Sequence, residues 1–346
     1  MALMRQSILR MTRSRLFTAF VDLLERMDDT STNLLRIVTY HRVDEFDRRP
    51  HLYPGMISAT PENFRRQMEH LRRHCRVLSV WEVLAAIRNR NPLPPRSVLI
   101  TFDDAYRDFA EQAWPILSEF DLPVTLFVPT AFPDDPGRRF WWDRLYKTLC
   151  GSVGTVRLTT PWHKTVDLNN DPTRNLRLFR RLRNHLKSLP HEEAMKWVDA
   201  ICLPVEGMPA NRPPETNDVL SWTELVELAS QGVTLAPHTQ THPLLNRVSS
   251  QVVHREAVGS YRDLRQRICH VPRVLAYPAG GVNQAAAETL KAAGFQLAMT
   301  TQRGLNDISQ ANPWELKRIN VGSSTALDLF RAQLLPQMRH LTRRIS

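Results

Sequence analysis

Two adjacent carboxylates, Asp103 and Asp104, are the residues whose placement most strongly indicates chemistry. They directly follow residues 98–102, an apolar run that predicts a buried strand. Two carboxylates at the end of a buried strand repel each other and raise one pKa unless a cation lies beside them. The pair therefore indicates a bound metal ion, whereas the purely structural alternative makes Asp104 a helix cap.

A histidine pair supplies further candidate ligands. His238 and His242 are four residues apart and are bracketed by Pro237 and Pro243. This spacing lets two imidazoles converge on one ion in a helix or tight turn, and the prolines favour a turn that leads into a helix. Imidazole and carboxylate ligands suit zinc, and three protein ligands leave positions open for water and substrate. Taken alone, such a pair is more often a set of surface or core histidines.

The two motifs together resemble a known family. Thr101-Phe-Asp-Asp104 followed by His238-Thr-Gln-Thr-His242 resembles the paired signature of the polysaccharide deacetylases, carbohydrate esterase family 4 with a NodB-type homology domain. Further segments resemble the exopolysaccharide deacetylase branch, in the expected order within residues 34–325: Tyr40-His-Arg-Val43, Pro61-Glu-Asn-Phe64, and residues 122–128, 276–280, 293–295 and 316–321. The resemblance implies a distorted (β/α) barrel that removes N-acetyl groups from an amino-sugar polysaccharide, oligosaccharide or lipid-linked glycan.

The resemblance also assigns roles to residues. Asp103 would be the catalytic base, and His41, which follows the first predicted strand, would be the general acid. Asp104, His238 and His242 would bind a divalent metal, with zinc as the first choice and cobalt, nickel or manganese as alternatives. The backbone near Ala279, in the segment that also holds Tyr277 and Pro278, would contact the substrate and stabilise the oxyanion. A histidine that only packs or hydrogen-bonds is the alternative for His41.

The chain departs from the family pattern at several positions. Ala105 stands where a glycine usually follows the two aspartates. Ala276 and Ala279 stand where many members carry an Arg that orients the base and a Tyr whose backbone amide helps to hold the oxyanion. We therefore expect Arg318 to replace the missing arginine. The C-terminal Leu-x-His motif, which supplies the acid in many members, is also absent.

The rest of the chain favours a parallel α/β fold with an insertion. Predicted strands at residues 34–40, 98–102, 124–128, 233–236, 274–277 and 297–300 alternate with predicted helices at 64–73, 110–120, 222–230, 255–268 and 284–293. The length suits one barrel plus an insertion. We predict a basic helical segment at 1–33, the barrel at 34–330 with an insertion at about 133–220, and a basic tail at 331–346.

The predicted insertion contains two features that suggest a lid. Trp141 and Trp142 could stack on sugar rings, although large aromatic side chains are more often core. A basic helix begins near Asp171 and Pro172. One face of this helix is apolar, and the other carries Arg174, Arg177, Arg180, Arg181, Arg183 and Lys187.

Charge narrows the class of partner. The formal net charge is +11, but no recognised nucleic-acid module accompanies it, so we expect no nucleic-acid partner. The charge fits a solvated face, an acidic glycan or anionic lipid. Residues 1–15 read neither as a signal peptide nor as a membrane span, which predicts a cytoplasmic protein. Apolar residues between 9 and 24 form either a helix docked on the barrel or a peripheral contact with an anionic membrane.

Two other functions stay open at this level. The missing arginine and Ala105 are compatible with a non-catalytic glycan-binding or scaffold component of a polysaccharide biosynthesis system. An amidohydrolase that works on the same scaffold without a metal is the other alternative, and the complete Asp-His-His set disfavours it. Metal content and acetate release together distinguish these functions.

Overall fold

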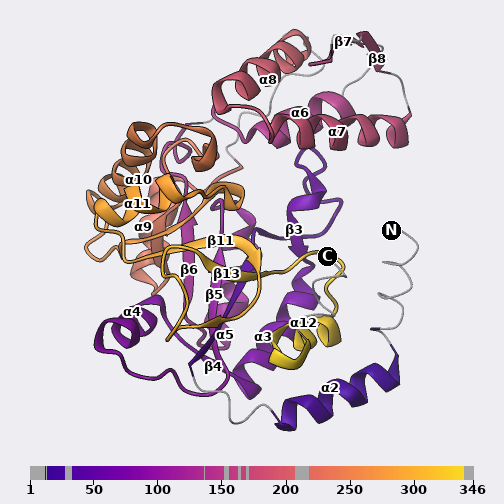
Figure 1. The fold of residues 1–346 in the computed structure, drawn as a ribbon. Coiled ribbons are helices and arrows are strands. Elements are labelled where there is room, and N and C mark those ends of the chain that lie inside the picture. The colour runs from indigo at the N-terminus through magenta and orange to yellow at the C-terminus, as the bar shows by residue number, and fades with distance from the viewer. Residues whose placement is uncertain are drawn as a thin grey trace.

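The sheet at the centre of the molecule is a parallel barrel that is nearly closed (Figure 1). The computed structural model describes residues 12, 14–27, 33–135, 137–151, 156–162, 165–168, 171–206 and 218–338. Seven strands run in the order β10 (Val274–Ala276), β11 (Leu297–Arg303), β13 (Leu316–Asn320), β1 (Leu34–Tyr40), β5 (Ser97–Phe102), β6 (Val124–Val128) and β9 (Thr234–Pro237). β9 and β10 lie next to each other but do not pair, which leaves one seam in the barrel.

Short strands and helices surround this sheet. β4 (Arg76–Val77) pairs with β5 in parallel, β12 (Asn306–Asp307) pairs antiparallel with β1, and β2 (Arg42–Val43) pairs with β3 (Ile57–Ala59). The helices around the barrel are α3 (Pro61–His74), α4 (Val80–Asn89), α5 (Trp114–Glu119), α9 (Trp222–Ser230), α10 (Ser250–Arg265), α11 (Gln284–Ala292) and α12 (Leu327–Leu334). Ser79 and Ser221 begin α4 and α9 with capping boxes, which satisfy backbone N–H groups at both helix starts.

Side-chain alternation along the strands separates the barrel interior from the helix layer. One set of alternate positions forms a single apolar cluster, which includes Leu35, Ile37, Leu99, Phe127, Ala236, Val274, Ala276, Leu297, Met299 and Leu316. The intervening positions, such as Val38, Ile100 and Leu126, belong to a different cluster. Successive side chains of a strand point to opposite faces, so the first set fills the barrel. The same parity leads to His41, Asp103, His238 and Arg318 at the carboxyl ends of the strands.

The predicted fold class is confirmed, and most predicted elements are present. Each predicted strand and helix has a counterpart, but residues 110–120 form a π-helical turn, η3 (Phe109–Ala113), followed by α5. β13 and α4 were not predicted. β13 has charged residues, Lys317 and Arg318, at its centre, and Arg318 is nevertheless fully buried. A buried ion pair, described below, explains this exception to the apolar pattern of inner strands.

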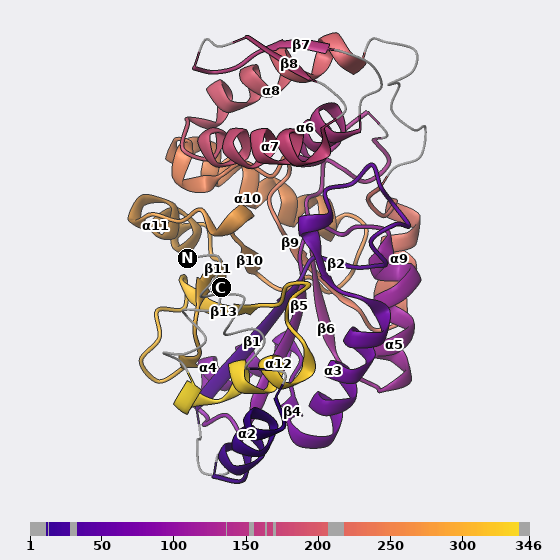
Figure 2. The same ribbon diagram turned by 90° about the vertical axis from the view of Figure 1, so that its right-hand side faces the viewer.

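The insertion folds as a cap above the carboxyl end of the barrel (Figures 1 and 2). It consists of α6 (Trp141–Cys150), the hairpin β7 (Val156–Thr159) and β8 (Thr165–Leu168), α7 (Pro172–Leu186) and α8 (His191–Glu206). α7 begins where the sequence predicted, because Asp171 accepts hydrogen bonds from the backbone N–H groups of Thr173 and Arg174. The cap packs on the barrel through Tyr53, whose ring lies 4.6 Å from that of Phe179 on α7.

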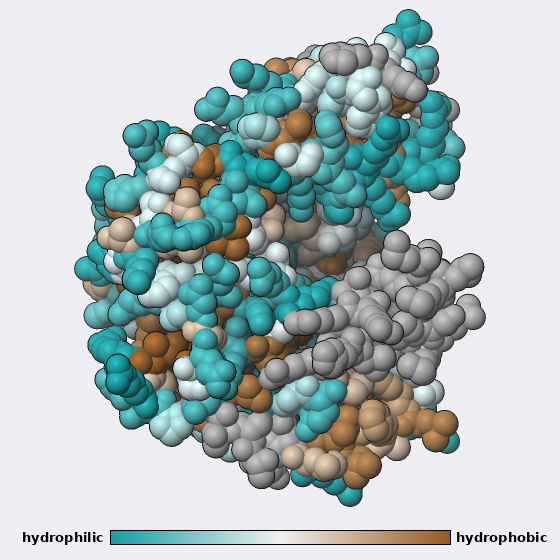
Figure 3. Space-filling model, viewed as in Figure 1, coloured by the Kyte–Doolittle hydropathy of each residue, from teal (hydrophilic) through white to brown (hydrophobic). Residues whose placement is uncertain are grey.

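The two ends of the described chain pack on each other. Phe17 and Val21 of α2 (Arg15–Met27) form a cluster with Ala332, Leu335 and Met338, so the predicted boundary at residue 330 falls inside α12. Leu16, Phe20, Leu23 and Met27 form an exposed apolar stripe beside this buried one on α2. The apolar area at the lower right of Figure 3 lies where Figure 1 places α2. Most of the predicted segment 1–15 and residues 339–346 lie outside the described part. No described helix combines the length and apolarity needed to cross a membrane.

Candidate active site

A cavity of about 280 Å³ lies between the barrel and the cap. From the barrel it is lined by His41, Asp103, Asp104, His238, His242 and Ala279, and from the cap by Trp141, Trp142, Arg183 and Lys187. These residues come from the segments that follow four strands, β1, β5, β9 and β10, and from two cap helices, which are far apart in the sequence. The fold therefore brings most of the predicted site residues to one cavity, at the carboxyl end where barrel enzymes place their sites.

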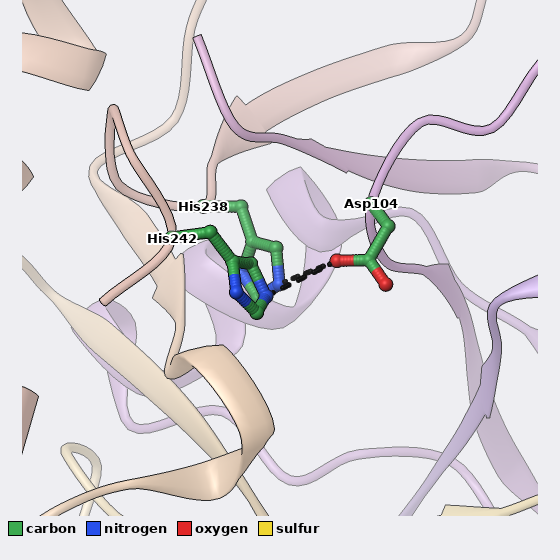
Figure 4. Close-up of side chains that lie close together, drawn as sticks. All are labelled: Asp104, His238 and His242. Carbon is green, nitrogen blue, oxygen red and sulfur yellow. Dashed lines mark ion pairs between the residues drawn. The ribbon is translucent and has the colours of Figure 1, made fainter. Parts of the chain in front are cut away.

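Asp104, His238 and His242 form a buried cluster in this cavity (Figure 4). One oxygen of Asp104, Oδ1, lies 3.3 Å from Nε2 of His238 and 3.2 Å from Nε2 of His242. Burial opposes ionisation of Asp104, but the two histidines outweigh it and hold the pKa of this carboxyl far below its usual range. The cluster combines one carboxylate with two imidazoles, a donor set that suits a divalent transition metal.

The orientation of His238 supports a metal more strongly than its proximity to Asp104. Its Nδ1 lies 2.8 Å from the carbonyl oxygen of Ala276, so Nδ1–H donates to that carbonyl across the seam between β9 and β10. In the neutral imidazole this places the lone pair of Nε2 toward Asp104, which also offers only lone pairs. Two acceptors facing each other need a cation or a proton between them, and a backbone partner for Nδ1 is typical of metal-binding histidines.

The backbone of both motifs is held in an uncommon conformation. Asp104, Ala105, Thr239 and His242 have φ values of 75°, 52°, 64° and 59°. Left-handed backbone is unfavourable for residues with a Cβ, and it occurs mainly where surrounding structure enforces it, often at functional sites. At Ala105 this conformation gives a physical reason for the glycine that the family usually has there.

Asp103 is paired with Arg318 deep in the barrel. The guanidinium Nη1 and Nη2 donate to Oδ1 and Oδ2 of Asp103 at 2.9 and 2.7 Å, and Nε donates to the carbonyl of Thr300. Burial disfavours the charged form of Asp103, but Arg318 and His238 outweigh it and lower the pKa of this carboxyl. Asp103 is therefore ionised, as a base must be. Arg318 makes the contact with Asp103 that we expected from a replacement for the missing arginine. The catalytic roles themselves stay predictions.

His41 lies on the open side of Asp103. Its Nε2 is 4.0 Å from Oδ2 of Asp103, and its backbone N–H donates to Ser58 Oγ. Burial lowers the pKa of His41, and Arg318 adds to this effect, while Asp103 and Asp104 oppose it. The neutral imidazole is thus favoured at neutral pH. As a general acid, His41 would be most active on the acidic side of its usual pKa.

The two cap tryptophans differ in burial. Trp142 is 6% exposed, stacks on Phe140 with ring centroids 4.5 Å apart, and contacts the ring of His242 edge-on. Its indole N–H donates to the hydroxyl of Tyr106, which donates in turn to Asp143. Trp141 is half-buried and lines the cavity. Packing therefore accounts for Trp142, and stacking on sugar stays a prediction for Trp141.

The segment predicted to contact substrate divides in the structure. Ala279 lines the cavity with a left-handed φ of 49°. Tyr277 is fully buried and its hydroxyl donates to the carbonyl of Trp314. Neither Tyr277 nor Pro278 is among the described residues that line the cavity. Of this segment, Ala279 is the residue that lines the cavity, and its contact with substrate stays a prediction.

Several cavity residues were not singled out from the sequence as site residues. Tyr53 and Ser58 lie in a loop and a short strand after β1, where no periodicity marks them. Arg183 and Lys187 were assigned only to the basic face of the predicted helix, and the structure shows that they line the cavity. A clue was available in the spacing, because Arg183 and Lys187 are four positions apart, which places them on one side of the helix.

The part of the chain that contains Asp103, Asp104, His238 and His242 is similar to known proteins. Residues 90–151 and 195–298 match the family model described as polysaccharide deacetylase. The poly-beta-1,6-N-acetyl-D-glucosamine N-deacetylase of Escherichia coli K12 is 23% identical over 311 residues, which are 89% of this chain but 39% of that protein's length.

Solved structures share the fold. The Streptococcus pyogenes deacetylase PplD, solved in complex with acetate, matches over 88% of this chain and 99% of its own, with 19% identity and a TM-score of 0.58. IcaB from Ammonifex degensii matches over 87% and 97%, with 18% identity and a TM-score of 0.57. The motif order, the matched residues and the shared fold agree with one another, and this chain belongs to the polysaccharide deacetylase family.

Proposed function

We propose that this protein is a metal-dependent hydrolase that removes N-acetyl groups from an amino-sugar glycan. The observation that carries the proposal is the arrangement of two buried acidic centres at one cavity. Asp103 is paired with Arg318, and the neighbouring Asp104 faces two imidazoles. The names of similar proteins, among them the poly-N-acetylglucosamine N-deacetylase, favour the same chemistry.

Each site residue has a defined task in this proposal. Asp104, His238 and His242 hold the metal, which when bound lowers the pKa of water and polarises a carbonyl group. Asp103 accepts the proton of the attacking water, and Arg318 keeps its carboxylate ionised and oriented. His41 donates a proton to the departing nitrogen. The backbone near Ala279 lies in the cavity where it can stabilise the oxyanion. Acetate and a free amino sugar are the products.

The choice of metal follows from the ligands. Two imidazole nitrogens and one carboxylate oxygen suit zinc best, and cobalt, nickel and manganese are the alternatives. Reconstitution of the metal-free protein with each ion, followed by acetate measurement, ranks them.

Acetate release from a panel of N-acetylated oligosaccharides, polysaccharides and lipid-linked sugars tests the function. We expect release by the wild type, its loss on treatment with a chelator, and its recovery when the metal is restored. Asp103→Asn should bind the metal and release acetate about 10²-fold or more slowly than the wild type. Release that survives complete metal removal would favour the metal-independent amidohydrolase. Glycan binding without release, in protein with a full metal complement, would favour a non-catalytic component.

A further inference from the structure

The wall of the cavity that α7 contributes carries two cations. Arg183 and Lys187 line the cavity opposite the barrel residues, and both belong to residues 152–194, which the family model does not match. Any ligand recognition by these two residues is therefore a property of the insertion and not of the part of the chain that matches the family model.

Arg183 is fixed by neutral groups. Its Nη1 donates to the hydroxyl of Tyr53 at 2.8 Å, and its guanidinium lies 5.3 Å from the centre of the Tyr53 ring. Its Nε is buried and has no hydrogen-bond partner. A buried guanidinium N–H without an acceptor is costly, so an acceptor brought by a ligand would be stabilised there.

Lys187 is one helical turn further along the same face. Desolvation and the positive charge of Arg183 lower the pKa of Lys187, while Asp104 opposes the shift. The two cations therefore repel each other, and a shared anion would relieve the repulsion. Basic residues are also favoured near helix C-termini by the helix dipole, but that preference does not explain why Arg183 and Lys187 line a cavity.

The carboxylates nearby do not neutralise this pair. Asp103 and Asp104 are the acidic residues among those described that line the cavity, and they are engaged with Arg318 and with the two histidines. No ion pair joins Arg183 or Lys187 to a carboxylate elsewhere in the described ranges. The cap wall of the cavity is thus positively charged without an internal counterion.

We infer that Arg183 and Lys187 bind an anionic group, carboxylate or phosphate, on the N-acetylated glycan. This inference rests on the proposed function and names the substrate class. Both cations and the Asp103 centre line one cavity of about 280 Å³, so the anionic group and the acetamido group belong to the same or neighbouring sugar residues. A guanidinium recognises either anion through two parallel hydrogen bonds.

Binding measured by calorimetry tests the inference without turnover. One probe is the alternating tetrasaccharide of glucuronate and N-acetylglucosamine, and its matched control is the same tetrasaccharide with its carboxylates methyl-esterified. N-acetylglucosamine 1-phosphate, compared with N-acetylglucosamine, tests phosphate as the source of charge. We expect the wild type to bind at least one charged probe about tenfold or more tighter than its neutral counterpart, and this preference to shrink as salt is raised.

Variants of α7 separate recognition from general charge. The double variant Arg183→Gln with Lys187→Gln should lose the preference for charged probes and keep the wild-type affinity for the neutral probe. The control Arg180→Gln changes an exposed arginine on the same helix and should keep the preference. Equal affinity of the wild type for charged and neutral probes, or equal loss on both in the double variant, would overturn the inference. A retained preference for charged probes without acetate release from any glycan would contradict only the proposed function.

A second observation, at the opposite end of the molecule, concerns α2. Leu16, Phe20, Leu23 and Met27 recur at helical spacing on one side of this helix and are 84%, 48%, 55% and 63% exposed. Phe17 and Val21, on the neighbouring stripe of the helix, already supply the apolar contact with Ala332, Leu335 and Met338. The exposed stripe therefore needs a different partner.

The charge around α2 favours anionic lipid. Asp22 and Glu25 are both ion-paired with Arg331. The hollow beside the helix is lined by five arginines and three carboxylates, namely Arg26, Arg66, Arg73, Arg96 and Arg331 with Asp22, Glu25 and Glu69. Residues 1–15 contain four arginines and no acidic residue. An apolar helix face flanked by basic residues is typical of helices that lie in the interface of an anionic bilayer.

We propose that α2 attaches the protein to an anionic membrane surface. Sedimentation with phosphatidylcholine vesicles, with and without phosphatidylglycerol, tests this. The wild type should bind the anionic vesicles, Phe20→Ser with Leu23→Ser should abolish binding, and Leu203→Ser, a similarly exposed leucine on α8, should not. Absence of binding by the wild type would refute the proposal, as would a wild-type dimer that the α2 double variant dissociates, because a second copy would then cover the stripe.

Discussion

The two walls of the cavity differ in how firmly they are held. On the barrel wall, Asp103, Asp104 and His238 are at most 2% exposed and have charged or backbone partners. On the cap wall, Trp141 and Arg183 are half-buried and Lys187 is exposed. The barrel side is thus built for fixed geometry, which chemistry needs, and the cap side for contacts that a ligand completes.

This difference predicts separate effects on the two walls. Substitutions on the barrel wall should alter the metal content or kcat, because those residues surround the reacting atoms. Substitutions on the cap wall should mainly alter KM and substrate preference, because their contacts are remote from the reacting amide.

The largest effect is expected at the metal cluster. Asp104→Ala, His238→Ala and His242→Ala each remove one of three ligands, and metal affinity should fall by about 100-fold or more in each. Elemental analysis of the purified variants measures this. His74→Ala, an exposed histidine on α3, is the control and should keep the metal. Stoichiometric metal in all three variants would refute the site.

The next effect is expected at the base and the acid. Asp103→Asn and His41→Ala should keep the metal and lower kcat by about 10²-fold or more, the usual size of a proton-transfer contribution. His41→Ala should also lose the alkaline limb of the pH profile. In the wild type this limb should fall below the ordinary histidine pKa of 6.5, because burial lowers the pKa of His41. An unaltered alkaline limb in this variant would assign the acid role to another residue.

Arg318 gives an internal check on the base. Arg318→Met leaves a buried, unpaired Asp103 and should lower the free energy of unfolding by about 3–5 kcal/mol. Adding Asp103→Asn should restore part of that stability, because the uncompensated charge disappears. Denaturant unfolding of the single and double variants measures the coupling, and additive losses would contradict a direct ion pair.

The two tryptophans of the cap wall differ in burial and should therefore differ in the effect of their removal. Trp142→Ala should lower stability by about 3–5 kcal/mol, because a packed aromatic ring and the indole hydrogen bond to Tyr106 are lost. Trp141→Ala should have a smaller effect on stability and raise KM for long oligomers more than for a single N-acetyl sugar. Melting temperature and KM against chain length measure both, and equal stability losses without a chain-length effect would contradict this difference.

The sequence predicted the barrel wall better than the cap wall. Strand periodicity located β1, β5, β6 and β9, and the residues after a buried strand could be recognised because carboxylates and imidazoles are unusual there. Arg318 was expected from the resemblance, but β13 was not predicted, because only the partner Asp103 makes a charged residue acceptable inside the barrel.

The cap could not be predicted to the same degree for a physical reason. The apolar stripe of α7 fixes which side packs, but it does not show whether the remaining residues face solvent or a cavity. That depends on where α7 lies over the barrel, which the loop residue Tyr53 and the ring of Phe179 determine by tertiary contact. Arg183 therefore looked like a solvated residue until its partner was known.

Asp143 links the cap to the pH dependence of stability. Burial raises the pKa of this carboxyl to about 7, although hydrogen bonds from Tyr106 and the Tyr53 backbone oppose the shift. In the unfolded chain its pKa is about 3.9, so between about pH 4 and pH 7 only the unfolded state releases this proton, and its contribution to stability falls as pH rises. Relative to Asp143→Asn, the wild type should lose on the order of 2 kcal/mol between about pH 5 and pH 8. A constant difference would contradict the raised pKa.

The smallest effect is expected at Ala105, where the chain departs from the family glycine. A left-handed alanine costs roughly 1–2 kcal/mol. Glycine would relieve that strain, but it would lose about 0.5–1 kcal/mol in backbone entropy and about 0.8 kcal/mol in burial of a methyl group. These terms nearly cancel, so Ala105→Gly should change stability by less than about 1 kcal/mol.

Ala113 provides the matched comparison, because it is equally buried but has an ordinary φ of −81°. Ala113→Gly has no strain to relieve and should cost about 2 kcal/mol, the sum of the methyl and helix-propensity losses. Unfolding of both variants, together with acetate release by Ala105→Gly, measures whether the departure matters. If Ala105→Gly lost as much stability as Ala113→Gly, the backbone of the metal motif would not be strained, and the usual glycine there would need another explanation.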